Sequence, residues 1–421
     1  MINFAEYYFT RYNTQPTLFE STPKTTIGII VVIPCYDDSF IFNTLESLEE
    51  TSSTATDMEV IVVVNSGINT PKNIVQKNNE IFAELKAKSE SDFYKRFKLL
   101  PVIIENISKK IAGVGYARKT GMDEAVRRFA AINKPDGIIV SLDADSLVNK
   151  NYFVSIENNF RQNPKNEVFT FQFQHDFNPI LYSKEEIEAC KLYEIYLRYF
   201  RLALLSTAFP YCFHTIGSCF GVKASAYVKV GGMPCKQGGE DFYFLHKLAP
   251  MTTIGEIKEI LVYPSPRLSD RVPFGTGPSV KNIMENNHYL VYNVRLFFIL
   301  KDFFSSLHRL ANTENIDLNI IPQEIIDFVG KDNLLSIINE CRKNAKLGKN
   351  LTKRLFSKFD AFFIVKFLNS FDAKSNYPPM DVFEAATLLL KYYEVEETDD
   401  IYDAMLKLDL AQYFPRSHKV H

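Results

Sequence analysis

Two carboxylates, Asp143 and Asp145, stand one residue apart at the end of the apolar run 137–142. A short run of this kind, rich in β-branched residues, is typical of a buried strand. Because side chains alternate along an extended backbone, both carboxylates are expected on one side of it. Mg²⁺ is usually held by one or two carboxylates together with substrate phosphates. The pair therefore predicts a metal-bridged nucleoside diphosphate site, and the plainer interpretation is a strand end with solvated acids.

The segment before these acids alternates between strand and helix patterns. Strands are expected at 27–34, 59–64, 99–104 and 137–143, with helical spacing between them. This order predicts an α/β domain with a mostly parallel sheet and flanking helices. Ligands of such sheets lie beyond the carboxyl ends of the strands. The segment from Pro34 to Asp38 and the side chain of Asn65 fall at the same edge as the acid pair.

Further candidate residues lie later in the chain. Glu240 and Asp241 follow two glycines at the start of a predicted helix, where the helix dipole favours negative charge. Simple helix capping would explain them equally well. Arg267 and Arg271 belong to a glycine-containing loop suited to phosphate or sugar capture, with surface arginines as the alternative.

The chain is expected to have three parts. Residues 1–25 form an N-terminal arm, residues 26–278 form the α/β domain, and residues 279–421 form a helical C-terminal extension. Apolar spacing in the last region is helical almost throughout and no glycine-rich loop interrupts it, so a structural or partner-binding role is expected for it.

Composition excludes some classes of protein and leaves others open. The net charge of −2 disfavours a general nucleic-acid binder. Six scattered cysteines favour reduced thiols and a cytoplasmic location. The most apolar stretches, 296–300 and 361–368, are too short to span a bilayer, which leaves only peripheral membrane association open.

Four motifs together carry a family resemblance. VVIPCYDD, GVGYARKTG, IIVSLDADS and GGEDFYF, in this order, resemble the family-2 glycosyltransferases of the GT-A fold over roughly residues 27–275. The resemblance implies a Rossmann-like sheet and a metal-dependent transferase. The expected reaction moves a sugar from a nucleoside diphosphate sugar to a hydroxyl acceptor, such as a saccharide.

The resemblance also implies roles for residues on the nucleotide side. Pro34, Tyr36 and Asp38 are expected to cradle the nucleotide, and Asn65 stands where the family usually has an acid that reads the base. The choice between a UDP-sugar and a GDP-sugar therefore stays open. Arg118 matches the arginine of the family's A-R-N-x-G segment.

On the reaction side, the resemblance assigns Asp143 and Asp145 to a Mn²⁺ or Mg²⁺ ion, with Asp143 also contacting the donor. Glu240 and Asp241 match the family's acceptor-side acid pair. An acceptor hydroxyl needs a base to attack at neutral pH, and Asp241 is the expected base. Direct displacement would then invert the anomeric carbon.

Two other functions fit parts of this pattern. A phosphatase of the haloacid-dehalogenase type also uses D-x-D with Mg²⁺, but it carries that motif on its first strand. A non-catalytic GT-A scaffold would keep the fold without turnover. Four histidines, His175, His214, His246 and His288, are interpreted as structural, with an extra metal ligand as the alternative. The donor sugar, the acceptor, the stereochemistry and the oligomeric state stay open.

Overall fold

The computed structural model of the protein describes residues 3–12, 14, 16–269 and 275–411. Arg271, one of the two predicted loop arginines, lies outside these residues. The chain divides into two compact units. Unit 1 comprises residues 1–182 and 214–278, and unit 2 comprises residues 183–213 and 279–421. The second unit thus includes a segment from the middle of the chain as well as the predicted helical region.

Unit 1 is built on one sheet of eight strands, in the order β3-β2-β1-β4-β7-β6-β8-β5. The strands are β1 (Ile27–Cys35), β2 (Asp57–Gly67), β3 (Lys98–Ile107), β4 (Ile138–Ser141), β5 (Ser146–Val148), β6 (Asn166–Phe173), β7 (Phe220–Lys223) and β8 (Thr253–Pro264). Strands β3, β2, β1 and β4 are parallel to one another, as are β6 and β8. Antiparallel pairs join β7 to β4 and to β6, and β5 to β8. This mixed, mostly parallel sheet confirms the predicted α/β fold.

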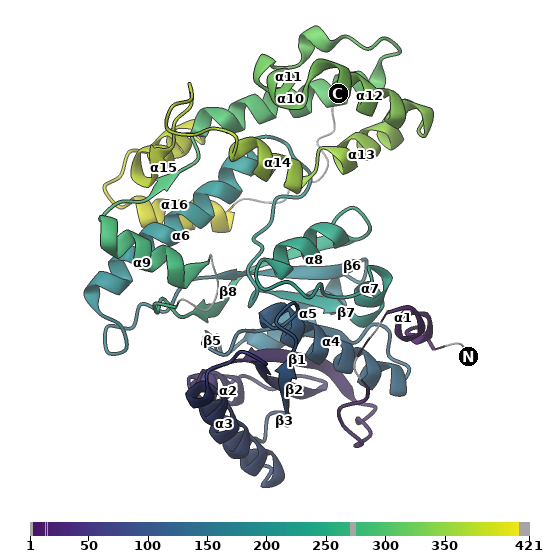
Figure 1. Cartoon of the computed structure of the whole chain (residues 1–421), viewed down its shortest axis with the longest axis vertical. Helices are drawn as coiled ribbons and strands as arrows, with labels where there is room; N and C mark the ends of the chain where they lie inside the picture. The colour runs from purple at the N-terminus through teal and green to yellow at the C-terminus, as the bar shows by residue number, and fades with distance from the viewer. Residues whose placement is uncertain (1–2, 13, 15, 270–274, 412–421) are drawn as a thin grey trace. The chain divides into compact units, whose positions relative to one another are not determined.

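Helices flank the sheet of unit 1 (Figure 1). They are α1 (Glu6–Arg11), α2 (Ile41–Glu49), α3 (Lys72–Glu90), α4 (Val114–Ala131), α5 (Tyr152–Gln162), α7 (Ala224–Lys229) and α8 (Glu240–Leu248). Helix α9 (Thr276–Asn286) runs across the boundary between the units. Helix α4 comes very close to the sheet, because a Cβ on Gly121 would lie 2.4 Å from Cγ1 of Val32. This close approach packs the middle of α4 directly against β1.

The N-terminal arm is fastened to α4. The Tyr8 hydroxyl donates to Asp123 at 2.7 Å and accepts from Lys119 at 2.7 Å. Tyr227 of α7 donates to the same carboxylate of Asp123 at 2.8 Å, and α1 lies beside α7 (Figure 1). Arg128 near the end of α4 donates to the carbonyl of Ser21 at 3.0 Å. The arm therefore braces the helix that carries Arg118.

Unit 2 is mainly helical among its described residues. Its elements are α6 (Lys184–Leu205), α10 (Val294–Asn312), η1 (Leu318–Ile320), α11 (Gln323–Val329), α12 (Lys331–Lys343), α13 (Lys349–Lys358), α14 (Ala361–Leu368), α15 (Val382–Tyr392) and α16 (Ile401–Ala411), with a small sheet of β9 (Leu290–Val291) and β10 (Met380–Asp381). A buried ion cluster ties α6 to α16. Arg198 contacts Glu194 and Asp409, both at 2.7 Å, and Arg201 also pairs with Asp409.

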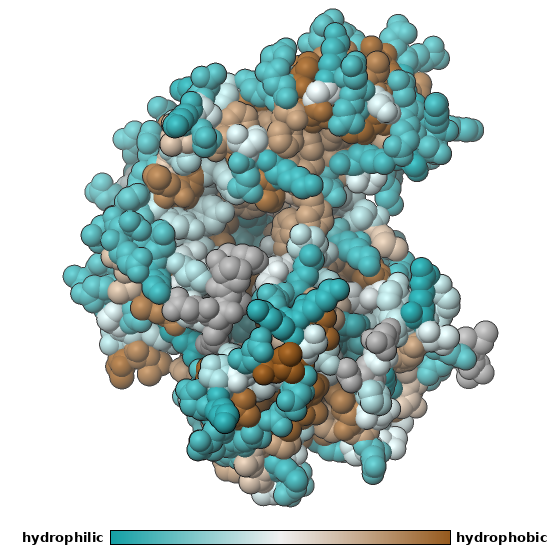
Figure 2. Space-filling model, in the orientation of Figure 1, coloured by the Kyte–Doolittle hydropathy of each residue, from teal (hydrophilic) through white to brown (hydrophobic). Residues whose placement is uncertain are grey.

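On the face shown in Figure 2, hydrophobic residues lie in separate groups among hydrophilic ones. Within the described part of the chain, no helix combines the length and the apolar character that crossing a bilayer would require.

Candidate active site

The predicted site residues of β1 and β4 meet at one edge of the sheet. The two strands are parallel neighbours, with Val32 of β1 paired to Ser141 of β4. Their carboxyl ends therefore point the same way, and the loops that carry Asp38 and Asp143 follow directly. Strand β4 itself ends at Ser141, two residues before the first acid.

Arg118 is the centre of the first charged cluster. It lies in the first turns of α4, and its side chain is only 3% exposed. One guanidinium nitrogen donates to Oδ1 of Asp143 and another donates to Oε1 of Glu240. A Cβ on Gly217 would lie 2.7 Å from Nη2 of Arg118, so the absence of a side chain there gives the guanidinium its room. One buried arginine thus joins residues from the ends of β4 and the start of α8.

Asp241 lies next to this cluster at the second position of α8, and it is half-buried. Its Oδ1 accepts a hydrogen bond from the backbone N–H of Phe242 at 2.7 Å. Burial raises the pKa of Asp241 to about 6, with a further increase from the charge of Asp143 and an opposing decrease from Arg118. A carboxylate with this pKa is a stronger base than a free aspartate and is still ionised at neutral pH.

Arg267 is the centre of the second charged cluster. It lies three residues after the end of β8. Its Nε donates to Oδ2 of Asp145 at 3.0 Å, and its Nη1 donates to Oδ1 of Asp38 at 3.0 Å. Its Nη2 contacts Oδ2 of Asp38 and lies 2.8 Å from Oδ2 of Asp145. The Arg267 side chain is 27% exposed, whereas that of Asp38 is only 2% exposed.

The two acids of the D-x-D pair do not share one side of an extended backbone, and that expectation was wrong. Ala144 and Asp145 form a turn, closed by a hydrogen bond from the N–H of Ser146 to the carbonyl of Asp143 at 3.2 Å. The turn separates the carboxylates, so that Asp143 meets Arg118 and Asp145 meets Arg267.

The predicted nucleotide-side residues lie at the ends of β1 and β2. Pro34 is in β1, paired with Val63, while Tyr36 follows β1 and is half-buried. Asn65 is buried near the end of β2. Sequence reasoning missed Asn78, a buried amide in α3, which accepts from the N–H of Asp37 at 2.8 Å and donates to the carbonyl of Asn65 at 3.2 Å. This amide fixes both strand ends relative to each other.

Other polar groups beside Asp145 were also missed. Burial raises the pKa of Tyr182, and a hydrogen bond with Ser265 opposes that increase, while the nearby charges of Asp176 and Asp145 add to it. Asp176 accepts from the N–H of Asn178 at 3.1 Å, and its own N–H donates to the carbonyl of Pro264 at 2.9 Å. No residue spacing distinguishes these side chains in the sequence.

The four histidines lie in different surroundings. Nε2 of His175 lies 3.2 Å from Oγ1 of Thr276, and His214 packs edge-on against Phe173. Burial lowers the pKa of His246 to about 3, and His288 is exposed. Across residues 3–12, 14, 16–269 and 275–411, no group of three or more His, Cys, Asp or Glu side chains is arranged to hold a metal ion.

Two carboxylates, those of Asp38 and Asp145, are arranged in a way that suits a divalent cation. Oδ2 of Asp38 and Oδ2 of Asp145 both contact the same nitrogen of Arg267, so the two oxygens already converge on one positive group. Carboxylate oxygens are the ligands that Mg²⁺ prefers, and it commonly takes only one or two of them together with phosphate oxygens. The residues at this edge therefore fit the metal that the D-x-D resemblance implies.

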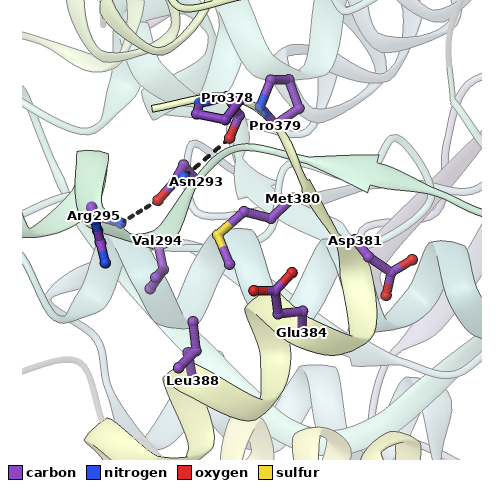
Figure 3. Close-up of a pocket in the computed structure, with 9 residues that line it drawn as sticks. All are labelled: Asn293, Val294, Arg295, Pro378, Pro379, Met380, Asp381, Glu384 and Leu388. Atoms are coloured by element: carbon purple, nitrogen blue, oxygen red, sulfur yellow. Dashed lines mark hydrogen bonds between the residues drawn. The ribbon is translucent and has the colours of Figure 1, made fainter. Parts of the chain in front are cut away.

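Unit 2 has a surface cavity of about 330 Å³ that involves none of the predicted site residues (Figure 3). Two of its polar side chains cap helices. Asn293 accepts from the N–H of Arg295 at 3.1 Å, and Asp381 accepts from the N–H of Phe383 at 2.9 Å. The side chain of Asn293 also donates to the carbonyl of Pro378 at 3.0 Å. These contacts give the two side chains structural roles.

Comparison with known proteins gives structural likenesses only. No protein-family model matches the chain, and no curated protein matches its sequence. A crystal structure of S. aureus TarS 1–349 in complex with UDP-GlcNAc is 12% identical, with a TM-score of 0.39, and the match covers 91% of this chain and 90% of that one. The complex of the same fragment with UDP is 14% identical, with a TM-score of 0.35, covering 92% and 93%. A longer S. aureus TarS structure is 11% identical, with a TM-score of 0.36, covering 84% and 60%. With TM-scores below 0.5, none of these likenesses bears on the site.

Proposed function

We propose that this chain transfers a sugar from a nucleoside diphosphate sugar to a hydroxyl group of an acceptor. The observation that carries the proposal is the double contact of Arg118 with Asp143 and Glu240. Through it, three of the four motifs that resemble glycosyltransferases converge at one sheet edge. Each motif alone is a weak signal, whereas their convergence in space is what a shared active site requires.

Asp241 would serve as the general base. The acceptor oxygen attacks the anomeric carbon while its proton passes to Asp241. The bond from that carbon to the diphosphate breaks, and the nucleoside diphosphate leaves with the bonding electrons. This direct displacement inverts the anomeric carbon. General-base catalysis of this kind typically contributes about 10²- to 10⁴-fold, and the raised pKa of Asp241 suits the task.

Positive groups at the sheet edge would stabilise the leaving diphosphate. Arg267 presents a partly exposed guanidinium, a group that binds phosphate oxygens in bidentate fashion. Arg118 would act from behind Asp143 and Glu240, to which its two terminal nitrogens donate. A divalent Mn²⁺ or Mg²⁺ ion at Asp145 and its neighbouring carboxylates would supply further positive charge for the departing diphosphate. The nucleoside itself would lie toward Pro34, Tyr36, Asp38 and Asn65. Asn65 offers both a donor and an acceptor, so either uracil or guanine stays a candidate base.

The proposal is tested by a thermal-shift panel with UDP, GDP, CDP, dTDP and ADP, each with and without Mn²⁺. A nucleotide at a hundred times its dissociation constant stabilises the fold by about 2.7 kcal/mol, which corresponds to a shift of a few degrees. We expect one or two of the five to raise the melting temperature. A folded protein that none of the five stabilises would contradict a nucleotide-sugar transferase and favour the scaffold.

A further inference from the structure

Asp143 and Asp145 differ in how firmly their arginine partners are held. Arg118 is 3% exposed and is hydrogen bonded to two carboxylates from different elements, Asp143 and Glu240. Replacing such a buried partner leaves an uncompensated charge, which is strongly unfavourable. Asp143 therefore faces a guanidinium that the buried carboxylate of Glu240 also holds in place.

Arg267 is held differently. Its side chain is 27% exposed and extends from the loop that follows β8, rather than from the body of a helix. Its pair with Asp145 is partly exposed on both sides and contributes little to stability. Its pair with Asp38 is buried on the carboxylate side, so Arg267 can leave only when another positive group takes its place. The Asp38 side chain is only 2% exposed. If Arg267 moved away, this buried carboxylate would still require a positive group beside it.

The geometry around Arg267 defines a position for that neighbour. One nitrogen, Nη2, contacts an oxygen of Asp38 and an oxygen of Asp145. A divalent cation at this position would carry twice the charge of the guanidinium, and its attraction to each carboxylate would be correspondingly stronger. Remaining coordination positions would be open to water or to phosphate oxygens, as is usual for Mg²⁺.

We infer that Asp38 and Asp145, rather than the D-x-D pair Asp143 and Asp145, are the carboxylate ligands of the divalent cation. Arg267 holds this position in the structure and is displaced when the cation binds. Asp143 then belongs to the arginine cluster beside Asp241. That the cation accompanies a nucleoside diphosphate rests on the proposed function, whereas the exchange with Arg267 is a property of the protein and the metal alone.

The test is a titration of the purified full chain with Mn²⁺, in which free Mn²⁺ is followed by electron paramagnetic resonance and no nucleotide is present. Arg267→Gln keeps every carboxylate and removes the competing charge, so we expect it to bind Mn²⁺ about fivefold more tightly than the wild type. Asp38→Asn and Asp145→Asn should each weaken binding about tenfold or more, because each removes one ligand. Asp143→Asn should stay within about twofold of the wild type.

A matched control is Lys77→Gln. Lys77 pairs with Asp37 at 2.7 Å, one residue from Asp38, and it is not part of the inferred cation position. This variant should bind Mn²⁺ as the wild type does. Arg267→Gln removes the counter-ion of the buried Asp38, so the fold of each variant is checked by circular dichroism before the titration. If Asp38→Asn does not fold, Asp145→Asn, whose side chain is 26% exposed in the wild type, supplies the ligand-loss result.

The opposite results would overturn the inference. These are Mn²⁺ binding that is weaker or unchanged in Arg267→Gln, a loss in Asp143→Asn with none in Asp38→Asn, or no Mn²⁺ binding by either the wild type or Arg267→Gln. Failure of the proposed function would look different. In that case Mn²⁺ would bind with the expected pattern, while no nucleoside diphosphate would bind with or without it.

Discussion

Arg118 and Glu240 form an ion pair in which each side chain is only 3% exposed, although the two residues are 122 positions apart in the sequence. The pair joins α4 to the start of α8. Because Asp241 is the next residue of α8, the same contact also fixes the backbone that carries the proposed base. The proposed role of Asp241 therefore depends on a contact that also stabilises the fold.

Arg118→Ala should destabilise the fold by about 3–5 kcal/mol, because it leaves Glu240 buried without its counter-ion. Chemical denaturation followed by circular dichroism measures this loss. Lys229→Ala is the control, since Lys229 makes a half-exposed surface pair with Glu167 at 3.6 Å and should change stability by less than about 1 kcal/mol. Equal effects of the two substitutions would show that the Arg118 cluster has no special structural role.

Asp241→Asn should leave nucleotide binding within about twofold of the wild type and reduce transfer about 10²- to 10⁴-fold. In the wild type, the base is ionised above its pKa of about 6. The rate at low substrate concentration should therefore be constant above about pH 7 and fall as the pH drops through 6. A wild-type rate in Asp241→Asn, or a rate that rises on acidification, would remove Asp241 from the role of base.

The same substitution should raise thermal stability. The pKa of Asp241 is raised on folding, from 3.8 to about 6, so ionisation of this group costs stability as the pH rises between those values. An asparagine avoids that cost. The melting temperature of Asp241→Asn should exceed that of the wild type by a few degrees at pH 7, and the difference should vanish below about pH 4. A variant that is less stable than the wild type at pH 7 would contradict the burial of a charged carboxylate here.

Gly115→Ala should disturb the loop that leads to Asp241. Gly115 donates its N–H to the carbonyl of Lys236 at 3.2 Å, and a Cβ at this position would lie 2.3 Å from that oxygen. Because backbone rather than a flexible side chain is in the way, the loop must shift. We expect a loss of about 1–3 kcal/mol in stability and about tenfold or more in transfer rate.

The control for this glycine is Gly221→Ala, in the same unit. A Cβ on Gly221 would come no closer than 3.3 Å to any neighbour, and the nearest atom belongs to the side chain of Phe171. Its effect on stability and on transfer should be smaller than that of Gly115→Ala. If the ranking is reversed, the approach of the loop to α4 does not govern the position of Asp241.

The sheet of unit 1 could be predicted because each of its central strands has a recognisable pattern within its own short stretch of sequence. All nine residues of β1 are buried, and a fully buried strand between helices reads as an unbroken apolar run. The order of the strands along the chain then places Pro34, Asp38, Asn65 and Asp143 at one edge. Predicting these positions required only the rule that ligands gather at the carboxyl ends of parallel strands.

The partners of the charged groups could not be predicted in the same way. Arg267 and Asp38 are 229 positions apart in the sequence. No motif or residue spacing around either of them indicates that they are in contact. The turn at Ala144 could not be predicted either, because the same residue sequence is compatible with an extended strand end. Packing in the folded protein decides between the two conformations. Likewise, Asn78 resembles an ordinary surface residue of α3 until the fold buries it against the ends of β1 and β2.

The most direct test of the central claim is the release of nucleoside diphosphate from UDP-sugar and GDP-sugar donors, with Mn²⁺ present, by the wild type and by Asp241→Asn. Water or an added sugar alcohol can serve as the acceptor. Slow, Asp241-dependent release from one donor class, and much less from the other, is the predicted result. Release that is absent from the wild type although the donor binds, or release that is equal in the two proteins, would contradict the proposed glycosyl transfer.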